Sequence, residues 1–332
     1  MDPYDSDSSV DEDFTETSVL LGYADEEVIE DTISHLGGWP SWIDENTPPP
    51  GDYANCKVCN GPMLLLLELH GDLPDHFPNN ERRLYIFGCP RKPCNRKPGS
   101  IRAYRATRKV RISSPAPASA SGTATKQTPE SMGVQAPWPA QSAFPAPYKK
   151  YYLDAEYETM SRPSTPTIPE NVTVEPMEED SAGGEGNVEL KDTFESEMDK
   201  AFMKFSMRLA HNPEQVLRYE YRGTPLLSSY TDQVGKRLHP EHSAGRVTTT
   251  GGGSMPPCEY CGAPRVFEMQ LVPHTISMLE DGREGVGLGE GDAGMEWGTI
   301  IVGVCGQDCA PEKIGQLGWR EEWAGVQWEE MK

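Results

Sequence analysis

Eight cysteines are the residues of this 332-residue chain whose type and spacing most clearly suggest chemistry. They form two sets, each made of a CxxC pair and a second close pair further along: Cys56, Cys59, Cys89 and Cys94, then Cys258, Cys261, Cys305 and Cys309. Four thiolates at the corners of a tetrahedron are a common structural zinc site, and they leave no open position for a catalytic water. We therefore predict up to two structural Zn²⁺ sites, one in each set.

The loops between the paired cysteines are long, but their length does not argue against metal binding. They contain 29 residues in the first set and 43 in the second, and closing either loop costs roughly 3 kcal/mol. Structural zinc contributes on the order of 10–16 kcal/mol, which exceeds this cost. The alternative is buried free thiols, since cysteine packs well as a small apolar side chain. Two CxxC pairs that each have a downstream partner pair favour metal.

Apolar runs next to the cysteines predict the strands that position them. In the first set, residues 63–69 follow the CxxC pair, and residues 84–88 end just before the second pair. Both runs are short and bounded by turn residues, which favours strands. If the two strands pair in an antiparallel hairpin, both cysteine pairs lie at the same end of it.

The same line of sequence occurs twice. CNGPMLLLLEL at 59–69 aligns with CGAPRVFEMQL at 261–271, and LYIFGC at 84–89 aligns with IIVGVC at 300–305. Upstream, GWPSW at 38–42 has a counterpart in GTPLL at 223–227. Since these matches occur in the same order in both halves, we predict two homologous units that pack side by side.

The predicted fold is therefore α+β and β-rich, with two related sheet-containing lobes packed into one body. Each lobe carries one four-cysteine zinc-type site. The expected boundaries are an acidic disordered tail over 1–17, an N-terminal lobe over 18–112, a linker over 113–189 and a C-terminal lobe over 190–328. The linker is poor in large apolar side chains, so we expect it to be mostly disordered. A returning strand is expected within it at 147–158, where aromatic residues gather.

The C-terminal lobe is expected to open with an amphipathic helix. Its apolar residues recur at helical spacing and share one face: Phe194, Met198, Phe202, Phe205 and Leu209. This pattern is typical of a helix that packs one face against a core. We assign these residues to the core and no cofactor to them.

Charge is distributed unevenly along the chain, whose net charge is −22. Residues 1–55 contain 15 acidic residues and no Lys or Arg, whereas residues 56–112 have a net charge of +8. A strongly acidic protein repels nucleic acid and attracts cationic partners at long range. The acidic N-terminal segment suits a basic partner, and the alternative is a tail that only increases solubility.

Other function classes find little support in the sequence. There is no signal peptide and no apolar run long enough to span a membrane, so we expect a cytoplasmic monomer with no membrane partner, while entry into the nucleus stays open. None of the seven histidines has HExxH spacing, and no GxSxG or phosphate-binding loop is present. We expect no enzymatic activity and no catalytic residues.

Taken together, these motifs resemble the programmed cell death protein 2 family, and within it the fungal twenty-S rRNA accumulation proteins. The N-terminal part of the resemblance consists of LLGYAD, GGWPSWID, CKVCNGPMLLLLEL, RRLYIFGC and RAYRATR. FPAPYKKYYLDAEYE is similar to the family's linker strand, and YEYRGTPLL, CEYCGAPRVFEMQL and MEWGTIIVGVCGQDC are similar to its C-terminal domain. The animal members carry an additional MYND-type zinc finger, where this chain has SSPAPASASGTATKQTP without a cysteine.

The resemblance implies a non-enzymatic role and a β-rich body with two related lobes. Members of the family act as dedicated chaperones for one basic small-subunit ribosomal protein, universal family number five, and so support small-subunit assembly and pre-rRNA processing. Trp39 and Trp42 could anchor such a client, because aromatic residues often do so at interfaces, although core packing is the alternative for at least one of them. Exposed sheet edges could also capture a client segment by strand addition.

The runner-up hypothesis is an RNA-binding zinc module that acts in rRNA maturation. The segment 91–111 contains nine basic residues, with an aromatic residue among them, and could follow a phosphate backbone. The alternative is a solvated face balanced by the acidic N-terminus. Because the basic segment is only one part of a net-acidic chain, we expect no direct binding of nucleic acid.

Overall fold

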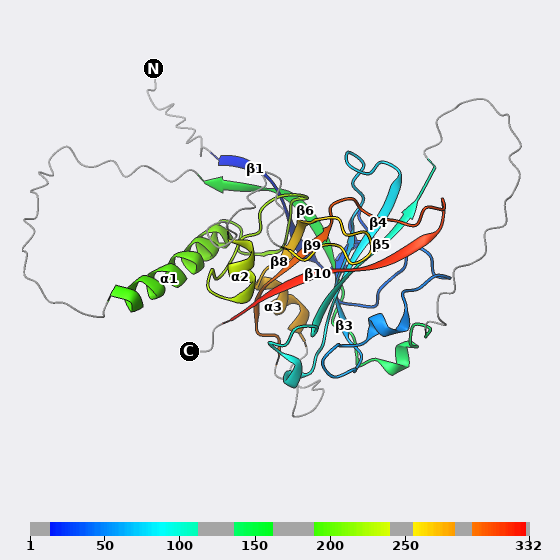
Figure 1. Ribbon diagram of the computed structural model, residues 1–332, viewed down its shortest axis with the longest axis horizontal. Helices are drawn as coiled ribbons and strands as arrows, with labels where there is room; N and C mark the ends of the chain where they lie inside the picture. Colours follow the sequence, from blue (N-terminus) through cyan, green and yellow to red (C-terminus); the bar gives the residue numbers. More distant parts are fainter. Residues whose placement is uncertain (1–13, 112–135, 162–188, 240–254, 283–293, 330–332) are drawn as a thin grey trace, which may run out of the picture.

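The fold is a single β-barrel with few helices (Figure 1). The computed structural model describes residues 14–111, 136–161, 189–239, 255–282 and 294–329. The strands in this part of the chain are β1 (Phe14–Asp25), β2 (His35–Leu36), β3 (Leu64–His70), β4 (Asn80–Gly88), β5 (Ile101–Lys109), β6 (Tyr151–Ser161), β7 (Gln215–Tyr219), β8 (Arg265–Leu271), β9 (Trp297–Cys305) and β10 (Leu317–Trp328). The helices are α1 (Glu189–Ala210), α2 (Gln233–Leu238) and α3 (His274–Glu280), with 3₁₀ turns at Gly51–Ala54, Lys92–Cys94 and Gln141–Ala143.

The ten strands close in the order β1-β6-β2-β3-β4-β5-β10-β9-β8-β7, and every pairing is antiparallel. Strands β1 to β6 form one side of the barrel and β7 to β10 the other. The sides meet at two seams, where β5 pairs with β10 and β1 pairs with β7. The β-rich fold class is confirmed, and the sheets of both halves of the chain share one closed barrel.

The two hairpins that adjoin the cysteines have the same irregularity. The register of β3 against β4 shifts between Leu65 and Leu67, and that of β8 against β9 shifts between Phe267 and Met269. The extra residue is therefore Leu66 in one hairpin and Glu268 in the other. These two residues are separated by 202 positions, the same offset that separates Cys59 from Cys261. The sequence match thus extends to a matching β-bulge, a local feature that bends a strand.

The barrel interior is filled by apolar side chains from both halves of the chain. Leu66, Leu84 and Ile86 from the first half lie in one cluster with Ile300 and Val302 from the second, each at most 1% exposed. Burial of this shared interior is the main favourable contribution to the fold. Neither half encloses this core alone, so the barrel is the unit that excludes water.

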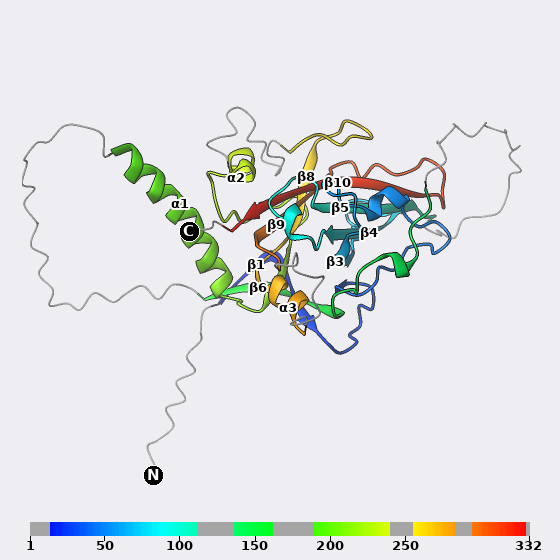
Figure 2. The same ribbon diagram turned by 90° about the horizontal axis from the view of Figure 1, so that it is seen from below.

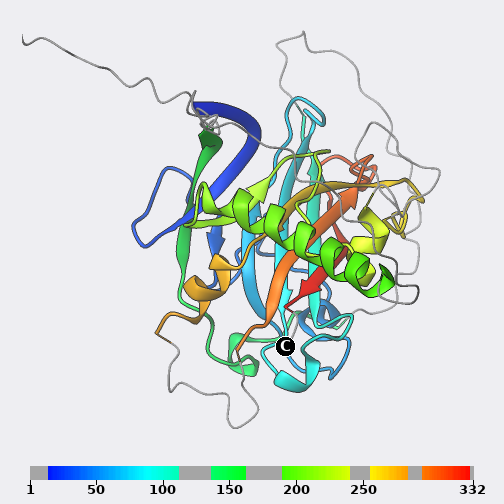
Figure 3. The ribbon, with the colours of Figure 1, turned by 90° about the vertical axis from the view of Figure 1, so that its left-hand side faces the viewer.

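Helix α1 lies across one side of the barrel (Figure 3), and its last turns are near the ends of β1 and β6 (Figure 2). Ala201 and Phe205 are buried, and Leu209 is half-buried. Phe202 was expected in the same buried face but is 60% exposed. That part of the prediction is wrong, because the helix contacts the barrel through a narrower stripe than the apolar spacing indicates. Phe194 and Met198 lie outside the residues whose side chains the structure describes.

Two segment boundaries differ from expectation. β1 begins at Phe14, so residues 14–17 belong to a strand and not to the tail expected over 1–17. Within the segment 113–189, residues 136–161 are described, and β6 overlaps the strand expected at 147–158. β6 lies between β1 and β2 and completes the barrel. The other residues of that linker, and residues 1–13, lie outside the described part.

No described helix is long and apolar enough to cross a membrane.

Candidate metal centres

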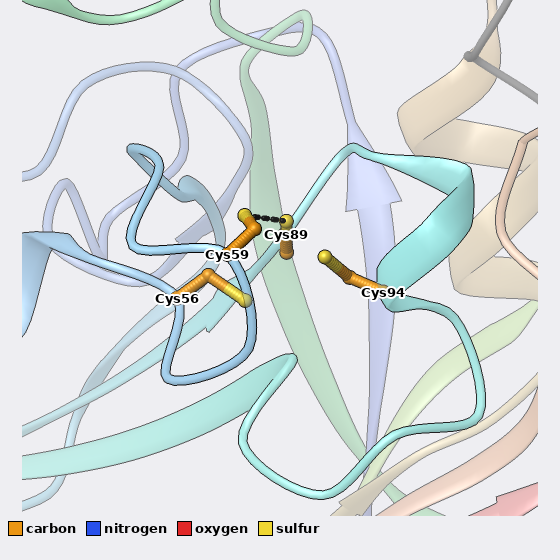
Figure 4. Close-up of side chains that lie close together, drawn as sticks. All are labelled: Cys56, Cys59, Cys89 and Cys94. Atoms are coloured by element: carbon orange, nitrogen blue, oxygen red, sulfur yellow. Dashed lines mark hydrogen bonds between the residues drawn. The ribbon is translucent and has the colours of Figure 1, made fainter.

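The first cysteine set lies at one end of the β3–β4 hairpin (Figure 4). Cys56 and Cys59 precede β3, Cys89 directly follows β4, and Cys94 ends the 3₁₀ turn Lys92–Cys94. Because Leu64 pairs with Gly88, the antiparallel register brings the two cysteine pairs together. The four Sγ atoms lie within 4.8 Å of one another, and those of Cys59 and Cys89 are 3.8 Å apart.

The second set repeats this arrangement on the β8–β9 hairpin. Cys258 and Cys261 precede β8, Cys305 is the last residue of β9, and Cys309 follows after a short turn. Again the four Sγ atoms lie within 4.8 Å of one another. The Sγ–Sγ distance is 3.7 Å between Cys258 and Cys309 and 3.4 Å between Cys261 and Cys305.

These distances suit a metal ion and not a disulfide. A tetrahedral ion about 2.3 Å from each sulfur places the sulfurs about 3.8 Å apart, whereas a disulfide needs about 2.0 Å. All eight cysteines are free thiols. Each group could therefore hold one metal ion, with all four positions filled by the protein.

The two CxxC turns have the same backbone geometry. The N–H of Asn60 donates to the carbonyl of Cys56 at 2.9 Å, and the N–H of Gly262 donates to that of Cys258 at 2.8 Å. Asn60 and Gly262 both have positive φ, 55° and 71°, a conformation that asparagine and glycine tolerate best. The sequence carries this signal in CNG and CGA, which place such a residue directly after the second cysteine of the pair.

Hydrogen bonds favour a thiolate in each set. Burial raises the pKa of Cys59, but hydrogen bonds, first that from the Gly61 amide, outweigh it and lower the pKa to about 7. In the second set, the hydrogen bond from the Cys309 thiol lowers the pKa of Cys305 to about 4, against the effect of burial. The thiolate is the form that binds metals, so hydrogen bonding within each set favours the metal-binding form of one cysteine.

A buried ion network joins the two halves of the chain beside the second set. It consists of Arg82, Arg105, Glu268, Asp308 and Glu322, whose side chains are fully buried. Two nitrogens of Arg82 donate to the carboxylate of Glu268 at 2.9 Å each, and its Nε donates to Asp308 at 2.8 Å. Arg105 donates to Asp308 at 2.6 Å and to Glu322 at 2.8 Å. Both arginines come from the first half and all three acids from the second.

This network also contacts the cysteines. Nη2 of Arg105 lies 3.7 Å from Sγ of Cys309. A carboxylate oxygen of Glu322 accepts from the N–H of Cys305 at 3.2 Å. The backbone of the second set is therefore fixed by charges that also hold the two halves together. Sequence reasoning missed this network, because partners such as Arg82 and Glu268 lie 186 residues apart and no local pattern connects them.

The two cysteine sets are also linked to each other across the β5–β10 seam. The hydroxyls of Tyr53, which precedes the first set, and Tyr260, which lies within the second, are 2.8 Å apart. Lys57 pairs with Glu321 at 2.8 Å, and the N–H of Glu321 donates to the Tyr260 hydroxyl at 3.2 Å. The clusters are thus neighbours in space although they are far apart in sequence.

Three basic residues of the segment 91–111 are committed to internal ion pairs on β5. Arg102 donates to both carboxylate oxygens of Glu321 at 3.0 Å. Arg105 belongs to the buried network, and Arg108 pairs with Glu81. Arg102 and Arg105 are not free to contact phosphates, whereas Arg108 is partly exposed, so the expected basic face is smaller than the sequence suggests.

Trp39 and Trp42 lie in an aromatic cluster, and Trp42 packs against the same apolar cluster as Cys56 and Cys94 of the first set. The ring of Trp42 packs against Trp138 at 5.1 Å and Trp319 at 5.4 Å between ring centroids. Trp39 meets the ring of Phe144 edge-on at 5.9 Å. Both tryptophans are half-buried, and they hold the segment around Trp138 and Phe144 against the outer face of the sheet.

Comparison with known proteins gives matches in both halves of the chain. Residues 18–119 match the N-terminal domain of programmed cell death protein 2, and residues 199–328 match its C-terminal domain. The chain is 42% identical over 132 residues to a Schizosaccharomyces pombe protein named probable 20S rRNA accumulation protein 4, covering 40% of this chain and 29% of that protein. A human programmed cell death protein 2-like protein is 30% identical over 143 residues, 43% of this chain and 33% of that protein.

The rat programmed cell death protein 2 is 25% identical over 93% of this chain and 96% of its own length. The chain thus spans about a third or less of the first relatives it matches, and nearly all of the rat protein. No solved structure matches the chain.

Proposed function

Because the chain belongs to the programmed cell death protein 2 family, we propose that it is a dedicated chaperone for a basic small-subunit ribosomal protein. In this role it supports assembly of the small ribosomal subunit and pre-rRNA processing. The observation that carries the proposal is the 42% identity to a protein whose name refers to 20S rRNA accumulation. The client is universal family number five, as the sequence resemblance implies.

Charge supports a basic client. The chain has a net charge of −22, and ribosomal proteins carry many lysines and arginines for contact with RNA. An acidic chaperone shields such a protein from RNA, and complementary charge accelerates its capture. The protein acts by binding and release, in the cytoplasm and as a monomer, and not by catalysis.

In this proposal both cysteine sets bind Zn²⁺, and each site is structural. Four sulfurs fill a tetrahedral coordination sphere and exclude substrate from the metal. The matching bulges and CxxC turns support two related lobes that arose by duplication and now share one barrel. The metal ions fix the hairpin ends that face each other across the β5–β10 seam.

Affinity capture from cells, followed by quantitative mass spectrometry, tests the proposal. A tagged full-length chain should recover one small-subunit ribosomal protein in near-stoichiometric amount, and the recovery should persist after nuclease treatment. Recovery of many unrelated proteins, without one dominant ribosomal protein, would overturn the chaperone role. RNA that stays bound in high salt would instead favour the RNA-binding zinc module, which the internal pairing of Arg102, Arg105 and Arg108 argues against.

A further inference from the structure

Strand β6 is paired along its length on one side only. On one side β1 pairs with it from Tyr152 to Ser161. On the other side β2 contributes just two residues, and the N–H of Leu153 donates to the carbonyl of Ser34 at 3.2 Å. Beyond Leu153, no strand in the described part of the chain pairs with this side of β6. The barrel is therefore closed by a short bridge that leaves a stretch of strand edge open.

The backbone groups on this edge are suited to accept another strand. In antiparallel pairing, the N–H and C=O groups of alternate residues point to the same side. Since the N–H of Leu153 points toward β2, those of Ala155 and Tyr157 point to the open side. The N–H of Ala155 donates to the side chain of its neighbour Asp154 at 2.9 Å. The open stretch ends at Thr159, whose carbonyl accepts from Asn212 at 3.2 Å.

A cavity of about 230 Å³ lies beside the same edge. Leu153 and Ala155 of β6 line it together with Leu69 of β3 and Leu217 of β7. The cavity thus adjoins both β3 and β6, the two strands that the short β2 connects. Its apolar lining and size suit one large apolar side chain from an added strand, a combination typical of peptide recognition by strand addition.

The rim of the cavity is acidic. Asp31 and Asp72 line it, and His70, the only basic residue among those that line it, pairs with Asp72 at 3.3 Å. Burial raises the pKa of each aspartate, but hydrogen bonds, led by those from Ser34 to Asp31 and from His70 to Asp72, outweigh it and lower both pKa values. Asp154 and Glu156 add two exposed carboxylates on the strand itself.

We propose that β6 residues 154–157 and the adjoining cavity, here called the β6 docking edge, bind an extended cationic segment by strand addition. The segment pairs with the backbone of Ala155 and Tyr157 and inserts one apolar side chain into the cavity. Some of its lysines and arginines lie near Asp31 and Asp72 at the cavity. Others lie near the exposed carboxylates of Asp154 and Glu156 on β6 itself. The inference deepens the proposed function and rests on it for the identity of the client, a basic protein.

A fluorescent nine-residue peptide of alternating Lys and Arg with one central Leu is the first probe, and anisotropy measures its affinity for the full-length chain. Asp31→Asn with Asp72→Asn should weaken binding at least tenfold, while each asparagine keeps one oxygen that accepts the local backbone N–H bonds, from Ile33 and Ser34 at residue 31 and from Arg82 at residue 72. Ala155→Pro, which removes the outward N–H, should weaken binding to a similar degree. Thermal melting checks that each variant is folded, and the aspartate variant still tests the edge if the proline variant is not.

The matched control is Glu312→Gln with Glu329→Gln, which removes the same charge from two exposed carboxylates elsewhere. Its affinity should remain within twofold of the parent. Equal weakening by control and edge variants would show that only net charge matters and would overturn the inference. So would unchanged affinity in both edge variants.

A second arm separates this inference from the proposed function. Affinity capture is repeated with the parent and the Asp31→Asn, Asp72→Asn variant. If the parent recovers a ribosomal protein and the variant recovers as much, the docking edge is wrong and the chaperone role stands. If the parent recovers no ribosomal protein but the peptide still depends on the edge, the proposed client is wrong and the edge stands.

Discussion

The sulfur atoms of each cysteine set lie 3.4–3.8 Å apart where pairs approach most closely, at the end of one hairpin. The metal would connect two strands whose own backbone pairing has already placed the ligands. Each ion would therefore stabilise its hairpin end and, through Arg105 and Tyr260, the seam between the halves.

Cys59→Ser and Cys261→Ser should each reduce the bound zinc from two ions per chain to one. Because structural zinc contributes on the order of 10–16 kcal/mol in small domains, each variant should lose several kcal/mol of unfolding free energy. Metal analysis by mass spectrometry and urea unfolding measure the two effects. Ser206→Ala, on α1, is the control and should retain both ions. Variants that keep two ions and unfold like the parent would show that the sites are not structural.

Arg105→Met should destabilise the protein by about 3–5 kcal/mol, because the buried carboxylates of Asp308 and Glu322 each lose one of two arginine partners, keeping only Arg82 and Arg265. Arg108→Met on the same strand is the matched control. Arg108 and Glu81 are about 30% exposed, so their pair contributes below about 1 kcal/mol. Chemical denaturation of both variants measures the difference, and equal effects would contradict the role of the network.

At the residue scale, the metal ligands could be predicted and the ion network could not. A metal site is encoded in the spacing of one residue type, which is visible along the chain. The bulge position illustrates the contrast, since it holds Leu66 in one hairpin and Glu268 in the other. Only the closed barrel, which brings Arg82 to Glu268, explains why a carboxylate is stable there.

At the scale of elements, Glu158 connects β6 to α1 and β7. Its buried carboxylate accepts from Arg208 at the end of α1 and from Arg218 on β7. The sequence predicts a strand near 147–158 from aromatic content, but it gives no partner for that strand. The spacing of Phe202 and Phe205 likewise predicts an apolar helix face. It does not show that the barrel covers Phe205 and leaves Phe202 exposed.

Glu158→Gln should destabilise the protein at neutral pH by about 3–5 kcal/mol, since two arginines lose their buried counter-charge. Burial raises the pKa of Glu158, but the arginines, first Arg208, lower it below its usual value. A depressed pKa contributes stability above the unfolded value that is lost as pH falls through the folded value. The parent should therefore lose stability steeply below pH about 4.5, and the variant less steeply. Parallel pH profiles of the melting temperature would contradict this.

At the scale of the whole molecule, closure depends on pairings between segments far apart in the chain. The sequence repeat predicts two related units. The low content of large apolar residues in the segment 113–189 predicts the linker between them. The pairing of β1 with β7 and of β5 with β10 has no local signal, because strand register is set by the turns and faces of the assembled sheet. The sequence therefore predicts two lobes packed into one body, but it does not predict that their strands share one closed barrel.

A chain cleaved at a protease site inserted between residues 162 and 188 should stay together during gel filtration. The two fragments share both seams and the buried network, so they should separate only in denaturant. Each fragment expressed alone exposes unpaired strands and should aggregate. Separation of the cleaved fragments in native buffer would contradict a barrel that needs both halves.

The two seams have a consequence for synthesis. β1 ends at Asp25 and β7 begins at Gln215, while β5 ends at Lys109 and β10 begins at Leu317. A ribosome that adds about 5–20 residues per second completes the two strands of either seam roughly 10–40 s apart. Throughout that interval the emerging first half presents β5 without its neighbour, an edge on which other nascent chains can pair. A protein proposed to act as a chaperone for a newly made protein is thus itself open to wrong strand pairing during its own synthesis.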